Sequence, residues 1–70
     1  MNTTFRSHVV AIEEEKDRLG IKFATKPGCY WIERHFQELV AVLRRSIQTG
    51  ERLEVTYESQ SMEIRDILCR

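Results

Sequence analysis

The stretch LRRSIQTGERLEVTY, residues 43–57, changes its hydrophobic repeat halfway along. Up to Ile47 the apolar residues are three or four apart, which is the repeat of an amphipathic helix. After Gly50 they are two apart, as in a strand with one buried face. Because glycine readily adopts positive φ, Gly50 is a natural end for the helix. The stretch therefore predicts a helix that leads directly into a strand.

The predicted helix carries apolar residues on one side and charged residues on the other. The apolar stripe is Ile32, Phe36, Leu39, Val40, Leu43 and Ile47. Arg44 and Arg45 are predicted to lie on the last turn, where the helix dipole favours cations. Two starting points remain open, one near residue 27 and one near residue 33. We favour the later start, because the CYWI segment, residues 29–32, is typical of a pleated surface.

Strands are expected before the helix. Residues 5–12 are rich in β-branched side chains, and LGIKFAT, residues 19–25, alternates between apolar and small or charged residues. The run EEEKDR, residues 13–18, is too charged to be buried and is predicted to form the solvated tip of a hairpin or the ends of its strands.

A second hairpin is expected after the helix. Residues 53–57 alternate, a turn is predicted over residues 58–61, and the last strand slips by one residue at Arg65-Asp66, which indicates a bulge. The predicted fold is α+β in the order β-β-α-β-β. A small antiparallel sheet or OB-like barrel would pack against one amphipathic helix, with residues 1–70 as a single domain.

Composition limits the classes of partner. The chain has 70 residues, with 11 basic and 11 acidic side chains, so no net charge attracts nucleic acid or anionic lipid over long range. No run approaches the roughly 20 apolar residues that cross a bilayer, and no signal peptide is evident at the start. We expect a cytoplasmic protein without a membrane partner. Cys29 and Cys69 are expected to be free thiols there, and to form one bridge if the chain is exported.

Catalytic patterns are not recognisable. His8 and His35 have no zinc-ligand spacing to each other or to the two cysteines. Cys29 precedes His35 by six residues, but a buried structural cysteine is the preferred interpretation over a nucleophile. The acidic run 13–15 is interpreted as a solvated turn. The sequence therefore predicts no enzyme, no cofactor and no metal.

Candidate binding residues gather around the Pro-Gly turn. Tyr30 and Trp31, with Arg34 close by, resemble the aromatic and arginine clusters of binding hot spots. Arg44 and Arg45 on the helix complete the candidate set. The structural alternatives are that Trp31 covers one end of the sheet and that the paired arginines only stabilise the helix end.

Residues 36–70, FQELVAVLRRSIQTGERLEVTYESQSMEIRDILCR, resemble the second half of the AB5 toxin B subunits, Shiga toxin B-like members above all. The shared pattern is a Leu-rich helix with a small residue near its end, a Thr-Gly stop, an alternating strand, a turn and a final strand. The resemblance implies an OB-like barrel and a ring of subunits paired strand to strand. The family's disulfide positions and sugar-contacting residues have no counterparts here, so no sugar-binding residue is carried over.

The leading hypothesis is a small non-catalytic protein-interaction module. Four short strands on so few residues leave sheet edges exposed, so we expect a homo-oligomer that self-associates through them, with another, larger protein as a regulated or inhibited partner. One alternative is a nucleic-acid-binding protein of OB-like type, disfavoured by the neutral charge. The other is a glycan-binding lectin, which requires export.

Overall fold

The computed structural model describes the backbone of residues 1–69 and the side chains of residues 1–68. It contains six strands and one helix in this part of the chain, and the predicted α+β class is confirmed. In chain order the elements are β1 (Asn2–Ser7), β2 (Val9–Glu14), β3 (Arg18–Phe23), β4 (Tyr30–Glu33), α1 (Gln37–Thr49), β5 (Leu53–Glu58) and β6 (Ile64–Cys69). The single strand predicted for residues 5–12 is two strands, and the favoured extended segment before the helix is β4.

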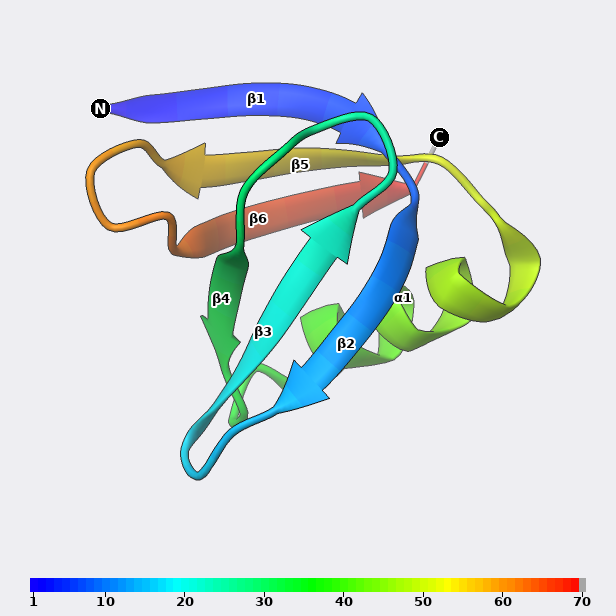
Figure 1. Cartoon of the computed structure of the whole chain (residues 1–70), viewed down its shortest axis with the longest axis horizontal. Coiled ribbons are helices and arrows are strands. Elements are labelled where there is room, and N and C mark those ends of the chain that lie inside the picture. The colour runs from blue at the N-terminus through cyan, green and yellow to red at the C-terminus, as the bar shows by residue number, and fades with distance from the viewer. Residues whose placement is uncertain (70) are drawn as a thin grey trace.

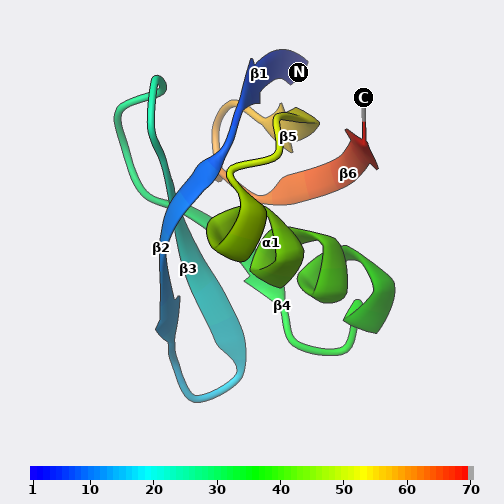
Figure 2. The same cartoon turned by 90° about the vertical axis from the view of Figure 1, so that its right-hand side faces the viewer.

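The strands form two antiparallel sheets, ordered β1-β5-β6 and β2-β3-β4 (Figure 1). β1 and β2 follow each other through His8 and form one bent arm that belongs to both sheets. On the other side, Trp31 forms an isolated parallel bridge with Glu63, and its backbone N–H donates to Met62 O at 3.1 Å. The two sheets are thus joined at both sides of a common core. The helix packs against β2 and β6 (Figure 2).

The helix ends as the sequence predicts. Gly50 has φ 76°, and its N–H donates to Ser46 O at 2.8 Å. The start lies at Gln37, after the β4 strand, which agrees with the later of the two predicted starts. The prediction that Arg44 and Arg45 lie on the last turn is wrong, because the helix continues to Thr49 and that turn carries no basic residue.

Only part of the predicted apolar stripe is buried. Leu43 is 0% exposed, and Ile32 is buried as a β4 residue rather than a helical one. Phe36 and Ile47 remain 42% and 41% exposed, which corrects their assignment to the core. Phe36 precedes the first helical turn, so the helical repeat does not turn its side chain toward the sheets. Leu43 and Ser46 are the buried residues of the helix, and the half-buried Leu39, Val40 and Val42 pack against the core beside them.

Four aromatic rings fill the space between the two sheets, contributed by Phe5, Phe23, Tyr30 and Tyr57. The ring centroids of Tyr30 and Tyr57 are 4.8 Å apart and those of Phe5 and Phe23 are 4.9 Å apart, both in edge-to-face arrangements. Burial, and next the proximity of Tyr57, raise the pKa of Tyr30 to about 12. Tyr30 therefore stays neutral at physiological pH, and both tyrosines are buried core residues.

The two predicted hairpins have the expected turns. The tip between β2 and β3 is exposed, as its charges indicate. In the second hairpin Thr56 pairs with Asp66 while Tyr57 pairs with Ile64, so Arg65 is the extra residue of the predicted bulge. Among residues 1–69 the helix is not long and apolar enough to cross a membrane.

Candidate functional site

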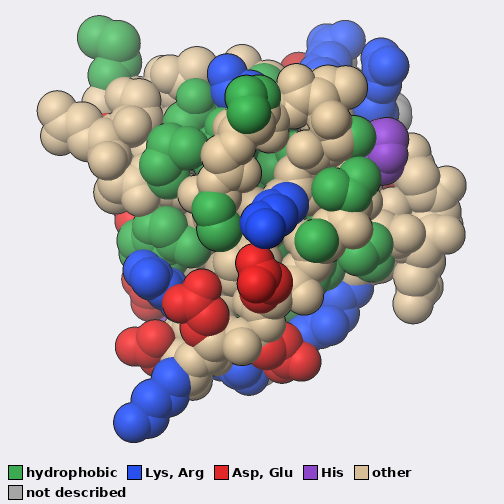
Figure 3. Space-filling view, in the orientation of Figure 1, with side chains coloured by type: hydrophobic (Ala, Val, Ile, Leu, Met, Phe, Trp, Pro, Cys, Tyr) green, Lys and Arg blue, Asp and Glu red, His purple; other side chains and the backbone are tan. Residues whose placement is uncertain are grey.

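A hollow of about 650 Å³ opens between the tip of the β2–β3 hairpin and the end of β4. The hairpin contributes acidic and basic side chains, and β4 contributes an indole and a carboxylate. The lining residues are Glu15, Lys16, Asp17, Arg18, Trp31, Glu33 and His35. Figure 3 shows acidic and basic side chains intermixed around this hairpin, at the lower end of the face in view. The hollow is therefore a polar surface site with one aromatic wall.

Trp31 forms that wall and also ties the two sheets together. Its indole Nε1 donates to Ser61 O at 2.8 Å, and the guanidinium carbon of Arg18 lies 5.2 Å from the ring centroid. Arg18 Nε in turn donates to Glu15 Oε1 at 3.1 Å. The predicted alternative, in which Trp31 covers one end of the sheet, matches this position, since the residue is half-buried at the seam between β4 and β6.

The five candidate binding residues do not form one cluster. Tyr30 is 1% exposed and points into the core, so it presents no surface to a partner. Arg34 Nε and Nη2 donate to Glu15 O at 3.0 and 2.7 Å and hold the hairpin tip in place. Arg44 pairs with Glu14 at 3.8 Å, and Arg45 pairs with Glu51 at 3.2 Å. Trp31 is thus the one member of the set on the hollow.

His35 and Glu33 form a pair that sequence reasoning missed. His35 Nδ1 lies 3.1 Å from Glu33 Oε2, and the imidazole packs against the ring of Phe36 with centroids 4.3 Å apart. A carboxylate that orients an imidazole is the arrangement used by general bases. Within residues 1–68, however, no Ser, Thr or Cys side chain hydrogen-bonds to His35. The only sequence signal was the presence of an acid two residues before a histidine.

Cys29 is an exposed free thiol, which corrects the prediction of a buried structural cysteine. Its Sγ contacts Tyr30 O at 4.0 Å and lies beside Gly20, where an added Cβ would be 3.6 Å from the sulfur. The side chain of Cys69 lies outside the described residues. Within the described part of the chain, no group of three or more His, Cys, Asp or Glu side chains is placed to hold a metal ion.

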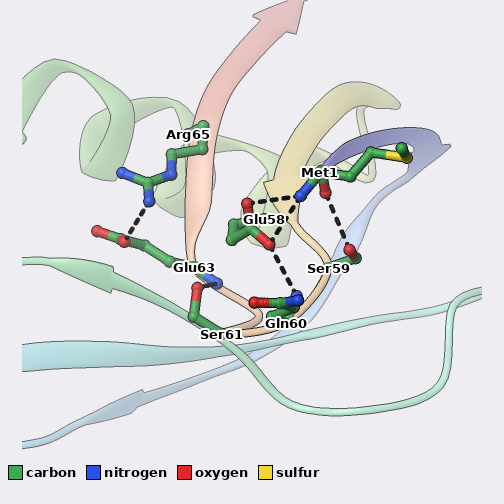
Figure 4. A network of polar contacts seen from close by, with 7 residues as sticks. All are labelled: Met1, Glu58, Ser59, Gln60, Ser61, Glu63 and Arg65. Atoms are coloured by element: carbon green, nitrogen blue, oxygen red, sulfur yellow. Dashed lines mark hydrogen bonds and ion pairs between the residues drawn. The ribbon is translucent and has the colours of Figure 1, made fainter.

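A polar network ties the first residue to the β5–β6 turn (Figure 4). The α-amino group of Met1 donates to both carboxylate oxygens of Glu58, at 3.1 and 3.0 Å. The backbone N–H and the hydroxyl of Ser59 both donate to Met1 O. The Gln60 N–H first, and then the α-amino group, lower the pKa of Glu58. These residues are 57 positions apart, so no local pattern in the sequence indicated the contact.

Comparison with known proteins gives two structural matches. No family model and no curated protein matches the sequence. The crystal structure of pro-protein-glutaminase and that of a mutant of the same protein each superpose with a TM-score of 0.87 at 18% sequence identity. The superpositions cover 99% and 100% of this chain but 26% of each matched chain. The chain therefore shares the fold of about one quarter of that precursor.

These matches correct the functional prediction. Both matched structures are of an enzyme precursor, which contradicts the non-catalytic module that self-associates through sheet edges and the prediction that the chain is not an enzyme. The nucleic-acid-binding and glycan-binding alternatives are set aside on the same finding.

Two other expectations remain predictions. Neither matched structure is an AB5 toxin B subunit, and the resemblance to that family is not tested by them. The homo-oligomer expected from the small core is likewise untested. Light scattering at micromolar concentration would measure the molar mass directly.

Proposed function

We propose that this chain is one domain of an enzyme system of the protein-glutaminase type. In such a system water adds to the side-chain amide carbon of a glutamine within a polypeptide, the C–N bond breaks, and ammonia leaves a glutamate behind. The observation that carries the proposal is the superposition over 99% of the chain with a TM-score of 0.87 on pro-protein-glutaminase. A shared fold alone does not specify an activity, so the proposal requires an assay.

The proposal assigns the chain one domain of the system rather than the whole catalyst. The matched precursor is about four times as long, since the chain covers 26% of it. Amide hydrolysis by a thiol requires a base within hydrogen-bond reach of the sulfur. In residues 1–68, Cys29 has no imidazole among its hydrogen-bond partners, and its sulfur contacts Tyr30 O instead. Further polypeptide, attached or separate, would supply the remaining groups.

Ammonia release from a synthetic peptide with one internal glutamine tests the proposal. The chain is assayed alone and after tagged recovery from its native cells, together with any attached or associated polypeptide. A peptide with asparagine in place of glutamine and a mock purification are the controls. Glutamine-specific release in either preparation would support the proposal, and no release in both would contradict it.

Two variants of the chain show which part of the system supplies the chemistry. Cys29→Ser removes the exposed thiol, and His35→Asn removes the imidazole held by Glu33. Full activity of both variants in the recovered preparation would assign the reacting groups to the other polypeptide. Loss of activity in one variant would assign that group to this chain. The cytoplasmic location predicted from the sequence belongs to the same proposal and is tested by cell fractionation.

A further inference from the structure

Among residues 1–69, β1 pairs along one of its two edges, the edge that faces β5. β1 and β5 are antiparallel with Asn2 opposite Glu58, and the N–H of Ser59 donates to Met1 O at 3.0 Å. Hydrogen-bonded and non-hydrogen-bonded pairs alternate along such a ladder. The odd-numbered residues of β1, such as Thr3, therefore direct their backbone groups toward β5. Its even-numbered residues, Asn2, Thr4 and Arg6, direct their N–H and C=O groups away from it.

The side-chain contacts agree with this assignment of odd-numbered residues to the hydrogen-bonded pairs and even-numbered residues to the other pairs. Side chains approach most closely across non-hydrogen-bonded pairs. Thr4 Oγ1 lies 3.1 Å from Thr56 Oγ1, and Arg6 Nε lies 3.4 Å from Glu54 Oε1, each directly across the ladder. These side chains are directed over the face of the sheet toward β5. They do not cover the outer edge of β1.

The outer edge of β1 continues into the edge of β2 that pairs with β3. His8 lies two residues after Arg6, and its carbonyl accepts from the N–H of Ala24 at 3.0 Å. The pairing stops there, because the next N–H, that of Thr25, donates to the Ser7 hydroxyl at 3.1 Å. The chain then leaves through Pro27, and Figure 1 shows β1 as the outermost strand of its sheet.

An extension of β3 would occupy the outer edge of β1, but no such strand is present in the described chain. The N–H and C=O groups of Asn2, Thr4 and Arg6 have no backbone partner within residues 1–69. Two of the usual means of protecting an edge are missing from β1, which contains no proline and no bulge. The bulges of this fold lie in other strand pairs, between β2 and β3 and between β5 and β6.

We propose that this outer edge binds an extended polypeptide segment as an added strand. Its free groups recur at every second residue, about 6.8 Å apart, and an extended peptide presents the same repeat. Main-chain hydrogen bonds supply the affinity in this mode of recognition. Binding through the main chain accepts many side-chain sequences, which suits an enzyme that acts on glutamines in different proteins. The segment is therefore the glutamine-bearing stretch of the substrate, an assignment that rests on the proposed function.

Amide hydrogen exchange of the isotope-labelled chain tests this inference, with an unstructured peptide carrying one internal glutamine as the probe. Asn2, Thr4 and Arg6 should exchange rapidly in the free chain, while Thr3 and Phe5 are already protected by β5. At a peptide concentration ten times the Kd, exchange at Thr4 and Arg6 should slow by about tenfold. No added protection at saturating or millimolar peptide would overturn the inference.

A proline substitution removes the proposed contact without disturbing the ladder within the chain. Thr4→Pro deletes an N–H that points away from β5, a position at which an edge strand tolerates proline. Thr4→Val keeps the N–H and is the matched control. Peptide binding should weaken at least tenfold in the proline variant and remain within twofold in the valine variant. Equal binding by both variants would contradict the inference.

A second probe keeps the chain unchanged in case the proline variant unfolds. N-methylation of alternate residues removes the donors from one edge of the peptide, and one of the two methylation phases should abolish binding. Unchanged binding of both methylated peptides overturns the inference. The inference is also overturned if the Thr4 N–H becomes more protected as the protein concentration rises without peptide. A second copy of the chain would then occupy the edge. Strand addition without ammonia release would support peptide binding at the β1 edge but contradict both the proposed function and the assignment of the peptide as substrate. Ammonia release without strand addition would support the proposed function and contradict this inference.

Discussion

The hydroxyl of Ser46 accepts a hydrogen bond from the backbone N–H of Val9 at 3.1 Å and so joins the helix to β2 across 37 positions of sequence. The same hydroxyl donates to Glu51 O at 2.8 Å, in the loop that leads to β5. Both Ser46 and Val9 are almost fully buried. One small polar side chain therefore fixes the helix against one sheet and orients its exit toward the other.

Ser46→Ala should lower the free energy of unfolding by about 1–3 kcal/mol, because it leaves the buried N–H of Val9 without an acceptor. Urea denaturation followed by circular dichroism measures the change. Thr49→Ala is the matched control, because the Thr49 hydroxyl also accepts from a backbone N–H, that of Glu51 at 3.2 Å, but lies at the surface. A loss for Ser46→Ala no larger than that of the control would show that water replaces the hydroxyl.

Leu43→Ala should cost about 2–5 kcal/mol, enough to unfold much of a domain this small. The sequence alone predicts the same loss for Phe36→Ala. The structure lowers that expectation to about 1 kcal/mol or less, because Phe36 is 42% exposed and precedes the helix. Melting temperatures of the two variants distinguish the alternatives. Equal destabilisation would place Phe36 in the core after all.

Glu58→Gln should make the free energy of unfolding depend less on pH in the acid range. The Gln60 N–H and then the α-amino group hold the pKa of Glu58 below its ordinary value of 4.5. A lowered pKa in the folded state means that the carboxylate contributes stability above pH 4.5, and that this contribution is lost as the pH falls through the folded-state pKa. Urea midpoints of the two proteins, measured from pH 7 to pH 3, should converge at the acid end. Parallel curves would rule out this linkage.

Replacing Arg44 and Arg45 together by alanine should leave the free energy of unfolding within about 1 kcal/mol of the parent, because both pair with carboxylates at the surface. Arg34→Ala should act differently, since Arg34 binds the backbone carbonyl of Glu15 through two nitrogens. Amide exchange in the β2–β3 tip should speed up in this variant alone. Faster exchange at the tip in the double variant would assign the same role to Arg44 through Glu14.

Much of the fold can be predicted from local patterns in the sequence. The sequence predicts the switch of repeat at Gly50, a bulge at Arg65-Asp66 and the exposed charges of the β2–β3 tip, and the structure confirms each. Each depends on residues close together in the chain, such as a glycine that adopts positive φ or a strand with alternating faces. The same grounds favour an extended segment at residues 29–32, and the structure places the strand at Tyr30–Glu33.

The functional surfaces were decided by tertiary structure. Tyr30 and Trp31 are neighbours in one strand and face opposite sides of the sheet, so one belongs to the core and the other to the hollow. The roles of Ser46 and Glu58, like the free edge of β1, depend on contacts with residues far away in the sequence. A repeat in the sequence shows which residues share a face. It does not show what that face packs against, because the partner is chosen only when distant segments meet.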